Sequence, residues 1–138
     1  MKKIYIILFA LVASLQMFAS LPIYRDADQI VTMDDKVYMQ GKIQILILEI
    51  SPVSEYAKTY WANIMPHSKS IPSKIAVTYA FSPDWTEYSI VAMLFYNSLG
   101  QQIDKIEVEE IVWDKTVSNV RARDMTNIAK GLPRQALK

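Results

Sequence analysis

Cysteine is absent from the 138-residue sequence, and this absence excludes several kinds of site. Without a thiol the chain can form no disulfide, no thiolate zinc centre and no cysteine nucleophile. It also offers no cysteine for lipid attachment behind a signal peptide, so we expect a protein that is not a lipoprotein. The fold must therefore be held together by its hydrophobic core.

Histidine and glycine are scarce, which narrows the chemistry further. The single histidine, His67, lies in a Met-Pro-His-Ser-Lys context without a nucleophile elbow, and no second histidine can share a metal with it. The three glycines, Gly41, Gly100 and Gly131, are isolated from one another and cannot build a phosphate-binding loop. We therefore predict a protein that is not an enzyme, with no catalytic residue, no metal and no cofactor.

The carboxylates leave two alternatives open. Asp26, Asp28, Asp34 and Asp35 could chelate a hard cation, but the sequence around them lacks the fixed glycine and the distal glutamate of a calcium loop. We favour turn-forming, solvated aspartates. The glutamates at 107–110 are interpreted as charge on a solvated sheet edge, where it discourages aggregation.

The N-terminus has the pattern of a cleavable secretory signal peptide over residues 1–20. Lys2 and Lys3 are followed by the apolar run from Ile4 to Ala13 and then by small and polar residues. The run is about ten residues long, whereas a membrane-spanning helix needs about twenty, so a retained anchor is the less favoured alternative. We expect an exported protein, periplasmic or secreted, with no integral membrane span after signal cleavage.

Charge is nearly balanced, with 15 lysines and arginines against 14 aspartates and glutamates. Removing Lys2 and Lys3 with the signal leaves 13 basic residues against 14 acidic ones. This balance does not suit a nucleic-acid-binding protein. The rest of the chain is long enough for one hydrophobic core, so we predict a single β-rich exported domain over residues 21–138.

Three apolar segments predict the centre of a β-sheet. Residues 43–50 alternate at first and then become apolar on both faces, and residues 88–96 are apolar on both faces, as suits covered interior strands. Residues 75–81 alternate large and small side chains. A further strand over 102–108 completes an antiparallel meander. Residues 21–32 are predicted to form a turn or a short helical piece that leads into the domain.

The pattern becomes helical near the C-terminus. Asn119 is the predicted N-cap, and Gly131 with Pro133 ends the helix. One stripe of the helix carries Ala122, Met125, Ala129 and Leu132. The predicted fold class is α+β and mostly β: an antiparallel meander sheet with a C-terminal helix packed on one face.

The connection over residues 51–72 is the first candidate for a binding surface. A short helix is predicted over 54–64 within it, because aromatic and apolar residues recur there at four-residue spacing. Aromatic side chains interleaved with cations are typical anchors of protein-binding surfaces. The predicted partner-binding residues are Tyr56, Lys58, Tyr60, Trp61, His67 and Lys69. The alternative is that this segment folds over the sheet as a lid of core aromatics.

The order of these pieces resembles the surface-adhesin protein E family of bacterial exported proteins. The likeness is carried by Tyr24-Arg25-Asp26, Ile30, Val37, the strand from Ile43 to Glu49, the turn Tyr96-Asn97-Ser98-Leu99-Gly100-Gln101, and Trp113. The chain lacks the cysteine pair that members of the family often bear. The resemblance implies an antiparallel sheet with a packed C-terminal helix, and a binding role toward host matrix or serum proteins.

The function predicted from the sequence is that of a non-enzymatic exported binding module, adhesin-like, that binds a protein partner. The alternative is a structural or accessory subunit of a bacterial envelope complex, in which another chain covers part of the apolar strands. A hydrolase that uses carboxylates ranks third.

Overall fold

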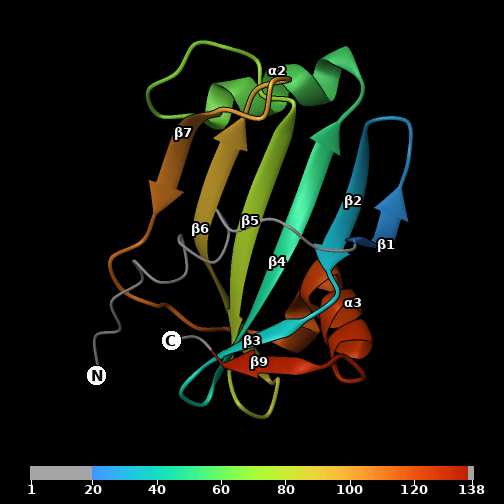
Figure 1. The fold of residues 1–138 in the computed structure, drawn as a ribbon, viewed down its shortest axis with the longest axis vertical. Coiled ribbons are helices and arrows are strands. Elements are labelled where there is room, and N and C mark those ends of the chain that lie inside the picture. Colours follow the sequence, from blue (N-terminus) through green and yellow to red (C-terminus); the bar gives the residue numbers. More distant parts are fainter. Residues whose placement is uncertain (1–19, 137–138) are drawn as a thin grey trace.

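The computed structural model describes residues 20–136, which form one β-sheet with helices packed against it (Figure 1). Apart from Ser20, the signal peptide predicted over residues 1–20 lies outside the described residues. Within the described part of the chain, no helix is both long and apolar enough to span a membrane.

The first two strands form a hairpin, so residues 21–32 contain the predicted turn, at Asp26, whereas the alternative of a short helical piece is wrong. β1 spans Ser20–Arg25 and pairs antiparallel with β2, Gln29–Asp34. Asp26 makes the turn between them, because its Oδ1 accepts the backbone N–H groups two and three residues further on, at 2.8 and 2.9 Å. Asp26 and Asp28 lie in this turn, and Gln29 begins β2.

The next hairpin turns at Gly41. β3 (Val37–Gln40) and β4 (Ile43–Pro52) pair antiparallel, and Gly41 has a φ of 61°, in the left-handed region that favours glycine. The first half of β4 pairs with β3 and its second half with β2. A bend at Asp35 and Lys36 separates these two partners. β4 itself is almost wholly buried, as predicted for residues 43–50.

The centre of the sheet is the antiparallel meander that the sequence predicts. β5 (Lys74–Phe81), β6 (Glu87–Tyr96) and β7 (Gln102–Glu107) follow one another, and β5 also pairs with β4. The large side chains of β5 all lie in the main core. The large residues that alternate along this strand therefore share one face, as predicted, and that face meets the helices.

Both helices begin at a polar cap. α2 (Glu55–Ile64) follows Ser54, whose Oγ accepts the N–H group three residues on at 3.0 Å. α3 (Val120–Ala129) follows Asn119, the predicted N-cap, whose Oδ1 accepts the equivalent N–H group at 2.9 Å. Each cap satisfies a backbone donor that the first helical turn leaves without a partner.

Short strands near the C-terminus were not predicted. β8 (Asp114–Lys115) pairs with the start of β6, and the 3-10 turn η1 (Thr116–Ser118) leads into α3. After α3, β9 (Arg134–Ala136) runs parallel to β3. The guanidinium of Arg134 donates to Oε1 of Gln44 at 2.7 Å, which ties β9 to β4.

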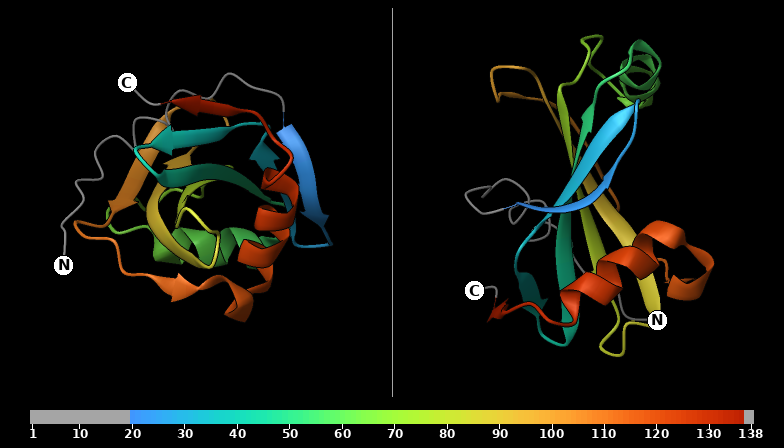
Figure 2. Two further views of the ribbon diagram at one scale, coloured as in Figure 1. Left: turned by 90° about the horizontal axis from the view of Figure 1, so that it is seen from below. Right: turned by 90° about the vertical axis from the view of Figure 1, so that its right-hand side faces the viewer.

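The strand order is β1-β2-β4-β5-β6-β7, with β3, β8 and β9 paired off this path. Both helices lie on the same side of the strands in the right-hand view of Figure 2. Trp61 of α2 and Met125 of α3 join one core with the inner faces of β4 and β5. The predicted fold class is confirmed: a mostly β, antiparallel sheet of meander type with a C-terminal helix on one face.

Candidate protein-binding surface

The solvent face of α2 carries the most exposed part of the predicted site. Tyr56 and Tyr60 lie one helical turn apart, with exposed fractions of 74% and 52%. Together with Glu55, Thr59 and Asn63 they line a shallow depression of about 430 Å³. We call these five residues the α2 surface. It presents two amphipathic rings from a capped helix, which is a rigid way to display aromatic contact area.

Trp61 lies elsewhere, which corrects its assignment as a partner-binding residue. It is 9% exposed and belongs to the main core. Successive residues of an α-helix are rotated by about 100°, so the residue after the exposed Tyr60 turns toward the sheet. The two rings meet edge to face with centroids 5.3 Å apart. Trp61 therefore anchors the helix. For this side chain the alternative interpretation holds, in which the segment folds over the sheet and contributes an aromatic residue to the core.

The two predicted lysines occupy different parts of this end of the molecule. Nζ of Lys58, on α2, lies 3.7 Å from Oε1 of Glu55. A solvent-exposed pair of this kind adds little stability, but it places a positive and a negative charge beside the tyrosines. Lys69 lies exposed in the loop between α2 and β5. The helix and the loop thus carry one predicted cation each.

His67 lies in the same loop and contacts β7. Its Nδ1 is 3.3 Å from Oδ1 of Asp104, and its side chain is 86% exposed whereas that of Asp104 is 4% exposed. Oδ2 of Asp104 accepts the backbone N–H groups of His67 and Ser68, each at 2.7 Å. Asp104 therefore anchors the loop through its main chain. Sequence reasoning missed this residue, since no local pattern links two segments so far apart.

The charge of Asp104 is set by these hydrogen bonds. Burial alone would raise its pKa, but the backbone donors of Ser68, His67 and Lys105 favour the ionised form and lower the pKa to about 2. At neutral pH the loop is consequently held by a carboxylate anion. The predicted residues divide into a helix group on α2 and a loop group anchored to β7.

Exposed apolar side chains extend this end of the molecule beyond the α2 surface. Val53, Ile71 and Leu99 have exposed fractions of 49%, 54% and 80%. They lie just before α2, just before β5 and in the turn between β6 and β7, which antiparallel pairing brings to the same end of the sheet. The sequence did not single them out as binding residues, because isolated apolar residues in turns show no periodicity.

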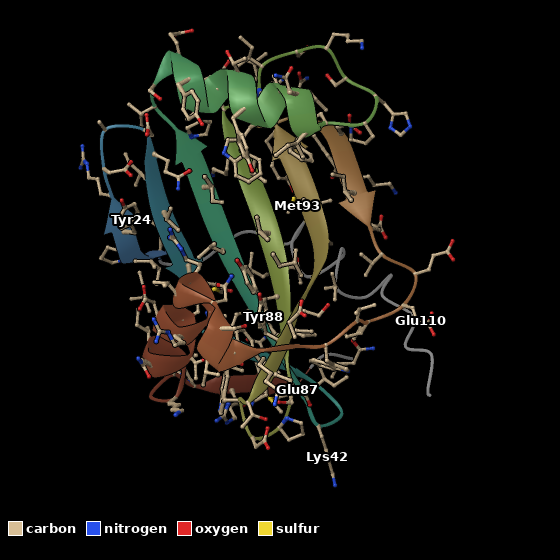
Figure 3. The ribbon with its side chains drawn as sticks, turned by 180° about the vertical axis from the view of Figure 1, so that it is seen from behind. Tyr24, Lys42, Glu87, Tyr88, Met93 and Glu110 are labelled. Atoms are coloured by element: carbon tan, nitrogen blue, oxygen red, sulfur yellow. The ribbon has the colours of Figure 1, made fainter. Side chains whose placement is uncertain are left out.

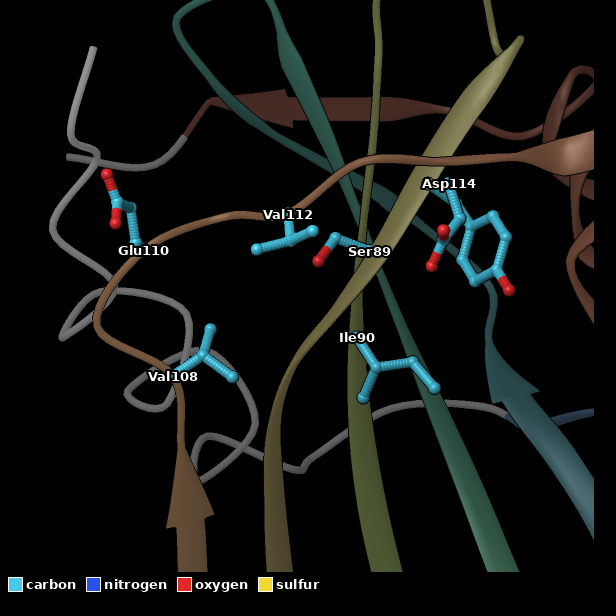
Figure 4. Close-up of a pocket in the computed structure, with 7 residues that line it drawn as sticks. Ser89, Ile90, Val108, Glu110, Val112 and Asp114 are labelled. Carbon is cyan, nitrogen blue, oxygen red and sulfur yellow. The ribbon is translucent and has the colours of Figure 1, made fainter. Parts of the chain in front are cut away.

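A second hollow, which the sequence did not indicate, lies at the outer edge of β6. It has a volume of about 260 Å³ and is lined by Tyr88, Ser89, Ile90, Val108, Glu110, Val112 and Asp114 (Figure 4). It forms where the chain leaves β7 and returns as β8. Figure 3 places Tyr88 and Glu110 on the half of the molecule away from α2. The glutamates at 107–110 were the nearest sequence signal.

Among the aspartates, Asp26 forms a turn as predicted, but Asp34 is not solvated. Asp34 is fully buried, and its Oδ2 accepts the hydroxyl of Tyr38. Burial raises its pKa to about 6. Across residues 20–136, no three histidine, aspartate or glutamate side chains gather in an arrangement that could hold a metal ion.

Comparison of the chain with protein-family models, with curated proteins and with solved structures gave no match. The resemblance to the surface-adhesin protein E family stays a prediction from the sequence. The α2 surface and the β6-edge hollow are therefore interpreted from their own geometry and chemistry.

Proposed function

We propose that this protein is a non-enzymatic binding module that captures a protein partner with the α2 surface. The observation that carries the proposal is the pair of exposed tyrosines, Tyr56 and Tyr60, on one face of a capped helix. Tyrosine is enriched at protein interfaces because its ring buries a large area while its hydroxyl stays hydrogen-bonded. The adjoining Glu55 and Lys58 supply a charged rim that favours particular partners.

The rigidity of α2 supports a role in binding. Ala57 and Trp61 are buried and fix the helix to the core, while the Ser54 cap closes its N-terminus. A rigid surface loses little conformational entropy when a partner docks. Exposed apolar groups at the same end enlarge the area available for contact beyond the depression itself.

The test is the double substitution Tyr56→Ala and Tyr60→Ala, which should abolish partner capture from envelope extract and from host serum. Circular dichroism should be unchanged, because both side chains point to solvent. Tyr24→Ala is the matched control, since Tyr24 is 45% exposed on β1. The proposal is contradicted if all three proteins retain the same captured species.

Export and an adhesin-like role form the second part of the proposal. The predicted signal peptide and the resemblance to the surface-adhesin protein E family support a host matrix or serum protein as partner. N-terminal sequencing of the product should find a chain that begins near residue 20. An intact Lys2-Lys3 terminus on a cytosolic product would contradict export.

A structural or accessory subunit of an envelope complex is the second candidate function. The exposed apolar side chains of Val53, Ile71 and Leu99 favour it, because a permanent partner would cover them. Sedimentation distinguishes the two candidates. A well-behaved monomer that binds its partner reversibly supports the binding module, whereas a protein that is stable only in a co-purified complex supports the subunit.

A further inference from the structure

The outer edge of β6 has a gap in its strand pairing. β7 pairs with β6 as far as Ala92, and β8 resumes the pairing at Tyr88. Between these two points, residues 89–91 have no register partner on this side, because the connection over 108–113 swings away from the strand. The hollow of about 260 Å³ occupies this gap.

The walls of the gap are fixed. The N–H group of Val108 donates to the carbonyl oxygen of Val91 at 3.1 Å, which closes one end. Ile111 is 5% exposed and packs with Val91 and Ala80 in a small core of its own, and Trp113 packs against that core. The connection is therefore held away from β6 by burial of its own side chains, and the gap is preformed.

The lining of the gap combines apolar walls with negative charge. Val108, Val112 and Ile90 supply the apolar surface, while Glu110 and Asp114 lie on opposite sides of the view in Figure 4. Within residues 20–136, the ion pairs that form engage neither of these two carboxylates. Lys115 follows Asp114 in the sequence and pairs in register with Glu87.

The size of the gap limits its occupant. Sites for drug-sized molecules have volumes of roughly 300–1,000 Å³, so this hollow is below that range. A strand edge without a partner favours an extended backbone, because strand addition pairs N–H and C=O groups along the edge. Two carboxylates favour a cationic side chain over a neutral or acidic one.

We propose that the β6-edge gap binds one or two residues of an extended peptide that carries a lysine or an arginine. The peptide backbone adds alongside Ser89 and Ile90, its apolar side chain packs against Val112 and Ile90, and its cation lies between Glu110 and Asp114. This site is separate from the α2 surface and does not depend on the function proposed for it.

The test is an NMR titration of the isotope-labelled full chain with capped pentapeptides. A peptide of alternating valine and lysine should shift the amide signals of Ser89 and Ile90, while its valine–glutamate counterpart should leave them unchanged. Capped lysine alone should bind at least tenfold more weakly than the lysine peptide, since it lacks the strand. Equal binding of capped lysine would overturn the peptide assignment and leave an amine site.

Substitutions separate charge from shape. Glu110→Gln combined with Asp114→Asn should weaken the valine–lysine peptide about tenfold and remove most of its salt dependence. Both side chains are exposed, so the fold should persist. Asp124→Asn, at an exposed position of α3, is the matched control and should bind as the unmodified protein does. The proposal is overturned if the double variant binds the peptide as well as the unmodified protein does. It is also overturned if the peptide shifts only amide signals of residues outside 88–114.

Discussion

The end of β2 and the middle of β7 each carry one buried carboxylate, Asp34 and Asp104, and the two are held in opposite ways. One oxygen of Asp34 accepts the Tyr38 hydroxyl, and the other has no hydrogen-bond partner within residues 20–136. Asp104 accepts three backbone N–H groups, from His67, Ser68 and Lys105. Burial raises the pKa of Asp34 to about 6, whereas the donors around Asp104 lower its pKa to about 2. Both carboxylates are buried, so the number of hydrogen-bond donors around each one decides whether its pKa is raised or lowered.

The two groups impose opposite pH dependences on stability. An unfolded aspartate has a pKa of about 3.9, so the raised pKa of Asp34 means that the folded state favours its protonated form. The contribution of Asp34 to stability therefore falls as the pH rises from about 4 to about 6. The folded state favours the ionised form of Asp104. The stability that this carboxylate contributes is therefore present above about pH 4 and is lost as the pH falls toward 2. These two groups together place the stability maximum near pH 4.

The largest expected effect comes from Asp104→Ala, which removes the acceptor of three backbone donors. We expect the free energy of unfolding at pH 7 to fall by about 3 kcal/mol, since hydrogen bonds to a charged group contribute about 1.5–3 kcal/mol each and water replaces part of them. Urea denaturation measures the loss. Amide hydrogen exchange at His67 and Ser68 should accelerate, and unchanged exchange would show that the loop is held by other contacts. Asp104→Asn keeps one acceptor and should lose less.

The second-largest effect is expected at Asp34, the carboxylate with the raised pKa. Asp34→Asn cannot ionise, so the decline in stability between about pH 4 and pH 6 should disappear. In the unmodified protein this decline should be on the order of 2 kcal/mol, because a shift of one pKa unit corresponds to about 1.4 kcal/mol. Unfolding free energies measured across this pH range compare the two proteins. Parallel profiles would mean that Asp34 titrates alike in the folded and unfolded states.

A smaller effect is expected when Asp34 loses its one donor. Tyr38→Phe removes the hydroxyl that hydrogen-bonds to this carboxylate, so the pKa of Asp34 should rise further and stability at pH 7 should fall by about 1 kcal/mol. The ¹³C chemical shift of the Asp34 carboxyl, followed during a pH titration, reports the change. A lowered pKa would contradict the role assigned to the hydroxyl.

The smallest effect is expected for His67→Ala. The imidazole is 86% exposed, and the loop is anchored through backbone N–H groups that alanine retains. Stability should change by less than about 0.5 kcal/mol, as is usual for exposed sites. Thermal unfolding near neutral pH is the measurement. A loss as large as that of Asp104→Ala would mean that the ring, and not the main chain, holds the loop.

Strong local patterns made much of the fold predictable. The alternation along β5 and the apolar run of β6 indicate interior strands, and the Asn119 cap with the stripe that follows it indicates α3. The hairpin of β1 and β2 was missed because several polar residues of its turn obscured the short flanking strands. β9 could not be predicted, since three residues carry no period and their partner lies in the N-terminal half.

The candidate site was predictable only in part. Spacing correctly identified the helix that carries Tyr56 and Tyr60. The interleaving of aromatic and cationic residues assigned Trp61 to the surface, although its position next to Tyr60 turns it into the core. The Asp104 anchor and the gap beside β6 depend on which strands meet and where pairing stops. Such features arise from tertiary register, and no local sequence pattern encodes them.

The parallel contact between β9 and β3 has a consequence for proteolysis. β9 covers one side of β3. Arg134 of β9 also lies over the ring of Trp85, with the guanidinium carbon Cζ 5.8 Å from the ring centroid. An exopeptidase that trimmed the chain back through Arg134 would leave β3 with an open row of N–H and C=O groups while sparing the central meander. Open edges of this kind recruit strands from other molecules, so a trimmed chain would be prone to self-association while most of its sheet stayed folded.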